Sequence, residues 1–219
     1  GDQDVAGGTG LGVIKPTFLY TVPGGFSRSL WRRTSDSRFL TRFFAGKGLD
    51  IGGDRDPLVA AKEFFPKLTD VDTWGEPDGD AQTMMGVQNE SYDFVFSSHC
   101  LEHLSDPKIG FKRWSELPKT GGYLIVEIPL WELYEKEQWP SRYSADHNTS
   151  FTLNRSTAQS APHLYSVIDL LMLIDRPYEL IKIEKLDHLY PYASNWEFDT
   201  CLLPYVHASA EIVIQFTKA

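Results

Sequence analysis

The fold of this chain is decided by residues 91–129, which read SYDFVFSSHCLEHLSDP at 91–107 and LPKTGGYLIVEIP at 117–129. The apolar run Phe94–Phe96 has the length and the aromatic and β-branched content of a buried strand. Apolar residues at helical spacing follow over Leu101–Trp114. Gly121-Gly122 predicts a turn, and Tyr123–Ile128 predicts a second buried strand. Strand–helix–strand units of this kind build parallel sheets with right-handed crossovers.

Further elements are expected on both sides of this unit. One predicted strand ends near Ile51, and a second covers Leu68–Val71 and ends at Asp72. A weak strand is predicted near Gly79–Gln82, and two more cover Tyr178–Leu186 and Ala210–Thr217. Helices are predicted over Ser27–Phe44, Pro57–Phe65 and from Pro162 to Ile174. The length of 219 residues suits one domain. We expect an N-terminal arm over residues 1–25, a single domain over 26–219, and a lid or acceptor-side insertion within it at 130–160.

Composition excludes some classes of function. The formal net charge of −9 disfavours a nucleic-acid partner, which normally requires a basic face. No segment approaches the roughly 20 apolar residues that span a membrane, so no membrane association is expected. The two cysteines do not indicate a disulfide framework, which favours a cytoplasmic location. Six basic residues between Arg28 and Lys47 are interpreted as a solvated face, with attraction of an anionic acceptor or partner as the alternative.

Acidic and glycine residues follow the predicted strands at the edge where ligands bind in open parallel sheets. Asp50 precedes the turn Gly52-Gly53, whose glycines let a ligand approach the backbone. Asp72 ends the next strand, where a carboxylate can accept both hydroxyls of a ribose. Asp80-Ala81 lies on the following loop, where a carboxylate can accept from the amine of adenine.

The charge near the glycine turn selects among nucleosides. Asp54 and Asp56 stand where a dinucleotide-binding fold offers bare N–H groups to phosphate, and two carboxylates there would repel it. The pattern therefore favours an adenosine that carries positive charge and no phosphate, and S-adenosylmethionine fits that description.

The loop after Phe96 carries the polar groups that could face the transferred methyl group. Ser97 and Ser98 follow the strand directly, and we expect them beside the cofactor. His99 is placed to face the methyl group or the acceptor. His99 and His147 are the candidate general bases for a hydroxyl or amine acceptor.

Four segments together resemble the class I S-adenosylmethionine-dependent methyltransferases, and within them a small bacterial type 11 group. They are Leu49–Gly53, Gly79–Ala81, Tyr92–Leu104 and Leu117–Tyr123. The resemblance implies a doubly wound α/β, Rossmann-like, mostly parallel seven-stranded sheet with helices on both faces and the last strand antiparallel. It also implies that Gly52 contacts the methionine part, Asp72 the ribose and Asp80-Ala81 the adenine.

Three functions remain open at this level. The favoured one is methyl transfer from S-adenosylmethionine to an unidentified small-molecule or saccharide-type acceptor. The alternative is a non-catalytic relative with a degenerate cofactor loop, because Asp54 and Asp56 replace the usual glycines. The third is a zinc hydrolase that uses His99-x-x-Glu102-His103, the signature of inverted zinc peptidases. That signature needs both histidines on one helical face, whereas His99 directly follows a strand, so no metal site is predicted.

Overall fold

The computed structural model describes residues 25–193, 197–203 and 205–218. The N-terminal arm predicted for residues 1–25 therefore lies, apart from Gly25, outside the described residues. Among those described, six strands form the main sheet, in the order β2-β1-β3-β4-β8-β7. Their bounds are β1 Gly46–Ile51, β2 Leu68–Trp74, β3 Tyr92–Ser98, β4 Pro118–Pro129, β7 Tyr178–Leu186 and β8 Ser209–Phe216.

The predicted fold class is confirmed, with one strand fewer than expected. Strands β2, β1, β3 and β4 run parallel, and β8 pairs antiparallel with both β4 and β7. The weak strand predicted near Gly79–Gln82 is absent, because these residues form a loop and a turn instead. Asp80 directs that turn by accepting hydrogen bonds from the backbone N–H of Gln82 at 2.8 Å and from the Thr83 hydroxyl at 3.2 Å.

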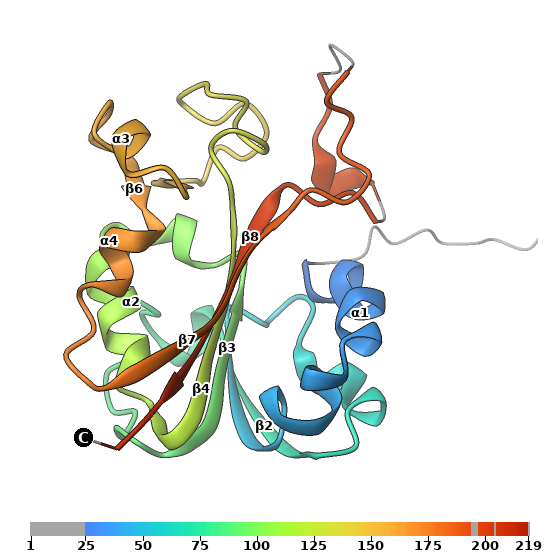
Figure 1. Cartoon of the computed structure of the whole chain (residues 1–219), viewed down its shortest axis with the longest axis vertical. Helices are drawn as coiled ribbons and strands as arrows, with labels where there is room; N and C mark the ends of the chain where they lie inside the picture. Colours follow the sequence, from blue (N-terminus) through green and yellow to red (C-terminus); the bar gives the residue numbers. More distant parts are fainter. Residues whose placement is uncertain (1–24, 194–196, 204, 219) are drawn as a thin grey trace, which may run out of the picture.

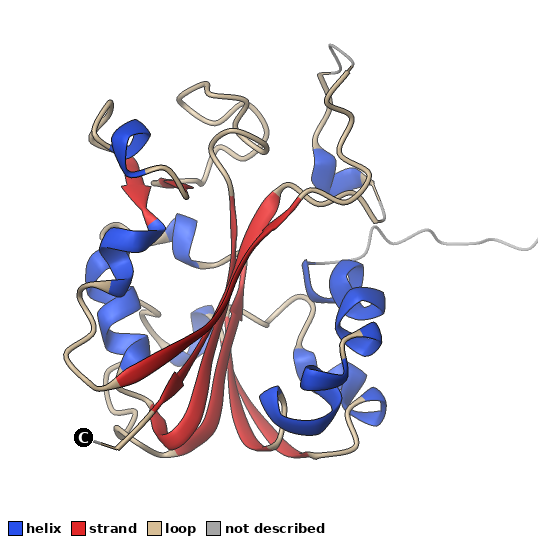
Figure 2. Cartoon of the chain, in the orientation of Figure 1, coloured by secondary structure: helices blue, strands red, loops and turns tan. Residues whose placement is uncertain are grey.

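Helices cover both faces of the sheet (Figures 1 and 2). One face carries α1 Gly25–Ser35, the π-helical turn η1 Phe39–Phe43 and the 3₁₀ segment η2 Leu58–Phe64. The other carries α2 Pro107–Ser115 and α4 Val167–Leu171. Strand β3 shows why both layers are needed, since Phe94 and Phe96 enter the core on the α1 side and Val95 enters the core on the α2 side.

Several helices differ in extent from the prediction. The helix expected over Leu101–Trp114 is broken into a 3₁₀ turn, η4 Leu101–His103, and α2. The break falls at Asp106-Pro107, where the Asp106 carboxylate accepts from the Lys108 backbone N–H and starts a new helix. The helix expected from Pro162 begins only at Val167, after a short strand, β6 Leu164–Ser166.

The segment 130–160 stands above the end of β4, with part of it in a second, two-stranded sheet (Figure 1). This sheet pairs β5 Ser150–Thr152 with β6. In the sequence, the short helix α3 Arg155–Ala158 lies between these two strands. A 3₁₀ turn, η3 Glu76–Asp78, follows β2, and another, η5 Thr200–Leu202, precedes β8. Within the described residues both cysteines are free thiols, and no helix has the length and apolar character that crossing a membrane requires.

Candidate active site

A cavity of about 810 Å³ lies at the carboxyl ends of β1, β2 and β3, where the topology predicts a ligand site. Most of the predicted site residues line it, namely Asp50, Gly52, Gly53, Asp80, Ala81, Ser98 and His99. Three predicted residues do not line it: Asp72, Ser97 and His147. The remaining wall includes an aromatic ring from Trp74 and several further carboxylates.

The loop after β1 needs its glycines for close contacts. Gly52 has a φ of +83°, and a Cβ there would lie 2.7 Å from the Cβ of Cys100. A Cβ on Gly53 would lie 2.3 Å from a carboxylate oxygen of Asp50. The Asp50 carboxylate also accepts a hydrogen bond from the Leu58 backbone N–H at 2.7 Å, so it holds the loop to the start of η2. Burial outweighs that bond and raises the pKa of Asp50 to about 7.

Asp54 and Asp56, which left the cofactor loop in doubt, both have partners within the protein. Asp54 accepts from the Glu76 backbone N–H at 3.1 Å and so joins the loop after β1 to the loop after β2. Asp56 accepts from the backbone N–H and the hydroxyl of Ser27, at 2.7 and 2.5 Å, in the first turn of α1. The two carboxylates line the cavity and also fix its walls, which accounts for their presence in place of glycines.

The acid at the end of β2 is a different residue from the one predicted. The strand runs to Trp74, two residues beyond the predicted end at Asp72. Asp72 is engaged elsewhere, accepting from the Tyr92 hydroxyl at 2.9 Å and pairing with the Lys47 ammonium at 2.7 Å. Glu76 lies just past the observed end of the strand and lines the cavity. Its position is the one that the sequence analysis assigned to Asp72.

The serine pair divides between packing and the cavity. Ser97 is fully buried, and its hydroxyl donates to the Ile51 carbonyl at 3.1 Å, which ties β3 to β1. Ser98 lines the cavity, and its hydroxyl is buried without a hydrogen-bond partner within the described part of the chain. Because strand side chains alternate between faces, only one residue of the pair could reach the ligand.

His99 lies between two buried glutamates. Its φ is +54°, and its backbone N–H donates to the Glu127 carbonyl at 2.9 Å. Its Nδ1 is 3.4 Å from the Glu102 carboxylate and its Nε2 is 3.7 Å from that of Glu127. Burial lowers the pKa of His99, but these contacts outweigh it and raise the pKa to about 10. An imidazolium at neutral pH suits a hydrogen-bond donor better than the general base predicted from the sequence.

His147 lies behind the cavity wall. Its Nδ1 is 2.7 Å from a carboxylate oxygen of Glu135, and its side chain is only 5% exposed. The residues on either side of it, Asp146 and Asn148, do line the cavity. The backbone N–H groups of Asn148 and Thr149 donate to the Glu102 carbonyl at 2.9 and 3.1 Å. These bonds fasten the segment after Pro129 onto the turn that follows β3.

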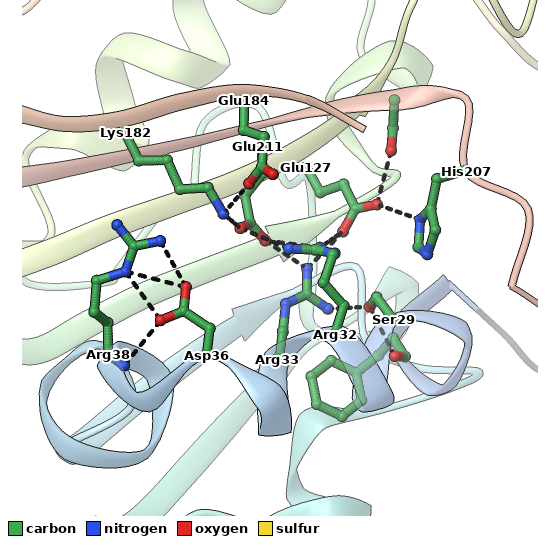
Figure 3. Close-up of polar contacts among 12 residues, drawn as sticks. Ser29, Arg32, Arg33, Asp36, Arg38, Glu127, Lys182, Glu184, His207 and Glu211 are labelled. Atoms are coloured by element: carbon green, nitrogen blue, oxygen red, sulfur yellow. Dashed lines mark hydrogen bonds and ion pairs between the residues drawn. The ribbon is translucent and has the colours of Figure 1, made fainter. Parts of the chain in front are cut away.

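A buried network of charges links α1 to β4 and β8 (Figure 3), and it includes Glu127, which lies 3.7 Å from His99 Nε2. The Arg33 guanidinium, 0% exposed, lies 2.6 Å from Glu127 on β4 and 3.1 Å from Glu211 on β8. Arg32 pairs with the same two carboxylates at 3.0 and 2.8 Å. This arginine–glutamate network anchors α1 on the sheet. The solvated basic face predicted for this helix is therefore wrong for Arg33, and also for Arg28, which is 7% exposed.

Comparison with known proteins gives one family. The model of a family described as a methyltransferase domain matches residues 28–167, which is more than half of the chain. No curated protein matches the chain.

Solved structures match at low identity. A chain in the complex that contains the Haloferax volcanii Trm112 methyltransferase activator matches with a TM-score of 0.56, 10% identity, and 89% of this chain and 91% of that chain covered. An S-adenosylmethionine-dependent methyltransferase from Archaeoglobus fulgidus matches with a TM-score of 0.51, 18% identity, and 87% and 94% coverage. The [4+2]-cyclase SpnF matches with a TM-score of 0.51, 11% identity, and 88% and 81% coverage. At these identities the matches show the fold.

Proposed function

Because this chain belongs to the methyltransferase domain family, we propose that it transfers a methyl group from S-adenosylmethionine to a small-molecule acceptor. The family model confirms the predicted family at the level of a methyltransferase domain. The methyl donor S-adenosylmethionine and the acceptor are part of our proposal. The observation that supports the proposal most directly is the 810 Å³ cavity, which brings together the glycine turn after β1 and the acids after β2 and near Asp80.

The residues of the cavity fit S-adenosylmethionine by charge and shape. Five carboxylates other than Asp50 line it: Asp54, Asp56, Glu76, Asp80 and Asp146. Such a wall favours a cationic nucleoside and disfavours a phosphorylated one. The cavity also has the size of an ordinary small-molecule site.

Each part of the cofactor has residues suited to it. The backbone at Gly52-Gly53 would take the methionine part, and Glu76 would accept the ribose hydroxyls. Ala81, Trp74 and Leu104 give apolar surface for the adenine, with Asp80 at the edge. When bound, S-adenosylmethionine supplies an activated methyl group on its sulfonium sulfur. The protein then has to hold an acceptor atom in line with that group and keep water out.

The acceptor side is formed by His99 and the segment after Pro129. Several of the aromatic residues that could stack on a sugar pack within the protein instead. Trp131 and Tyr134 are 9% and 5% exposed, and Trp139 stacks on His163 with ring centroids 4.2 Å apart. A small acceptor whose oxygen or nitrogen reaches His99 is therefore favoured over a saccharide held by stacking.

The other two functions are less well supported. The non-catalytic alternative rested on Asp54 and Asp56, which serve to fix the cavity walls. The zinc hydrolase needs an α-helix that presents both histidines, but His99 has left-handed backbone and Leu101–His103 is a single 3₁₀ turn.

Calorimetric titration with S-adenosylhomocysteine tests the proposal. We expect one molecule to bind per chain, and Glu76→Gln to weaken binding about tenfold, or roughly 1.4 kcal/mol, because a carboxylate that accepts from ribose hydroxyls is lost. The matched control is Asp72→Asn, which should bind as the wild type does. Absence of binding by the wild type contradicts the function. Loss of binding in the Asp72 variant alone contradicts the assignment of Glu76.

A further inference from the structure

The carboxylate of Glu102 is surrounded in an unusual way. The residue is 0% exposed, yet neither carboxylate oxygen accepts a hydrogen bond from the described residues. Three imidazoles lie around Oε1 instead: His99 Nδ1 at 3.4 Å, and the Nε2 atoms of His103 and His147 at 4.0 Å each. Burying a carboxylate without hydrogen bonds is costly. The arrangement therefore favours positive charge around Glu102, and the protonated His99 supplies part of it.

His103 and His147 are both oriented from behind. His147 Nδ1 is 2.7 Å from the Glu135 carboxylate, and His103 Nδ1 is 3.1 Å from the Asp146 carbonyl. Both partners are acceptors, so each Nδ1 carries the proton. A neutral ring then has its lone pair on Nε2, directed at the space beside Glu102. Histidines that ligate metals are held in this way, with the outer nitrogen donating to a carboxylate or a backbone carbonyl.

We propose that Glu102, His103 and His147 bind one divalent transition-metal ion at the wall of the cavity. Their candidate ligand atoms all lie within 4.8 Å of one another. Ligand atoms around a tetrahedral ion with bonds of 2.0–2.1 Å are roughly 3.3 Å apart, so the 4.0 Å separations between Glu102 Oε1 and the two Nε2 atoms have to shorten by about 0.7 Å. Two imidazoles and one carboxylate form a ligand set that suits zinc or iron(II) better than magnesium or calcium.

The site has a route to solvent and room for a further ligand. His103 is 35% exposed and lines the cavity together with Asp146, so an ion there would keep coordination positions open towards the cavity. Glu102, Glu135 and Asp146 also give the surroundings a negative charge. What such an ion does for an acceptor rests on the proposed function, whereas its binding does not.

This ligand set differs from the hydrolase signature that the sequence presents. In the proposed site His147 takes the place that His99 has in that signature. His147 lies 45 positions after Glu102 in the sequence. Its loop is held near Glu102 because the Asn148 side-chain amide donates a hydrogen bond to the His103 carbonyl. The alternative without a metal is that protonated histidines alone neutralise Glu102. The experiment has to separate these two cases.

Calorimetry distinguishes a bound metal ion from protonated histidines alone. The full chain is stripped with a chelator and then titrated with Zn²⁺, Co²⁺ and Mg²⁺ as probes. We expect Zn²⁺ and Co²⁺ to bind at one ion per chain and Mg²⁺ to bind far more weakly. Visible absorption of the Co²⁺ form should report nitrogen and oxygen ligands. His103→Ala and Glu102→Gln should each weaken Zn²⁺ binding more than about 100-fold, because loss of an outer-shell partner alone costs roughly 10–100-fold.

The matched control is His188→Ala, which removes an exposed histidine that packs on Trp31 and should leave Zn²⁺ binding unchanged. Glu135→Gln keeps all three ligands and should weaken binding roughly 10–100-fold. Absence of one-to-one uptake overturns the proposal, as does uptake that persists in His103→Ala. S-adenosylhomocysteine binding by the same stripped protein is measured separately, so failure of this site is distinguishable from failure of the proposed function.

Discussion

Two clusters of buried charge meet at His99, and they are satisfied to different degrees. In the arginine–glutamate network, Glu127 and Glu211 are 1% and 0% exposed and receive close bonds from Arg32 and Arg33 (Figure 3). Glu127 also accepts from the Ser209 hydroxyl at 2.9 Å. In the Glu102 cluster the carboxylate is just as buried, but its neighbours are imidazoles at 3.4–4.0 Å.

The difference separates a structural cluster from one suited to a ligand. Guanidinium groups stay charged at all ordinary pH values and bind carboxylates in a fixed geometry, so Glu127 and Glu211 have charged partners within the protein. Imidazoles can be neutral and can offer a lone pair to an ion. Substitutions of the same kind in the two clusters should therefore have unequal effects on stability.

The largest effect is expected for Arg33→Met. Removal of the guanidinium leaves two buried carboxylates short of a partner, so the free energy of unfolding should fall by about 3–5 kcal/mol. Urea denaturation monitored by circular dichroism measures it. The control is Arg38→Met, whose 41% exposed side chain pairs with Asp36 and should cost less than about 1 kcal/mol. Equal losses in both variants would contradict a structural role for the network.

A smaller effect, which depends on pH, is expected for Glu211→Gln. Burial raises the pKa of Glu211, but Arg33 and Arg32 outweigh it and lower the pKa from 4.5 to about 2. An acid with a lowered pKa in the folded state stabilises the fold above its unfolded pKa, and this stabilisation is lost as the pH falls through the folded pKa. The variant should be less stable than the wild type by about 3 kcal/mol at pH 7, and the gap should close between pH 4.5 and 2. If the difference in free energy of unfolding between the wild type and Glu211→Gln did not change with pH, the lowered pKa of Glu211 would not be the source of the stabilisation.

The smallest effect is expected for Glu102→Gln in metal-free protein. The exchange of carboxylate for amide removes one of the two carboxylates beside the protonated His99, but the imidazoles around Glu102 lie at 3.4–4.0 Å and not in close ion pairs. The free energy of unfolding should therefore fall by less than the roughly 3 kcal/mol expected for Glu211→Gln. Urea denaturation beside Glu211→Gln at pH 7 gives the comparison. A loss as large as that of Glu211→Gln would mean that the histidines already satisfy Glu102, and the contrast between the clusters would disappear.

The sequence predicted the parts of the fold that depend on local pattern. The run Phe94–Phe96 was enough to place a buried strand of the parallel unit, because strand alternation acts within a few residues. The turn predicted at Gly121-Gly122 is wrong, because both glycines lie inside β4. The end of β2 was placed two residues early. Pairing with β1 extends to Trp74 opposite Ile51, and such pairing is a property of the sheet and not of the segment.

The site could be predicted only as far as loops follow strands. Four predicted residues line the cavity because of their place in the chain. Gly52 and Gly53 directly follow β1, and Asp80 and Ala81 lie on the loop after β2. The burial of Arg33 escaped prediction because its partner Glu127 lies 94 positions away on another element. The approach of His147 to Glu102 was missed for the same reason, since a long loop decides it.

The fastening of the loop at residues 148 and 149 has a consequence for motion. The amides of both residues donate to a single acceptor, the carbonyl of Glu102, on the turn that borders the cavity. The loop can leave the turn only if both hydrogen bonds break together. Amide hydrogen exchange at Asn148 and Thr149 should therefore be slow, should occur at matching rates, and should report how often this wall of the cavity opens.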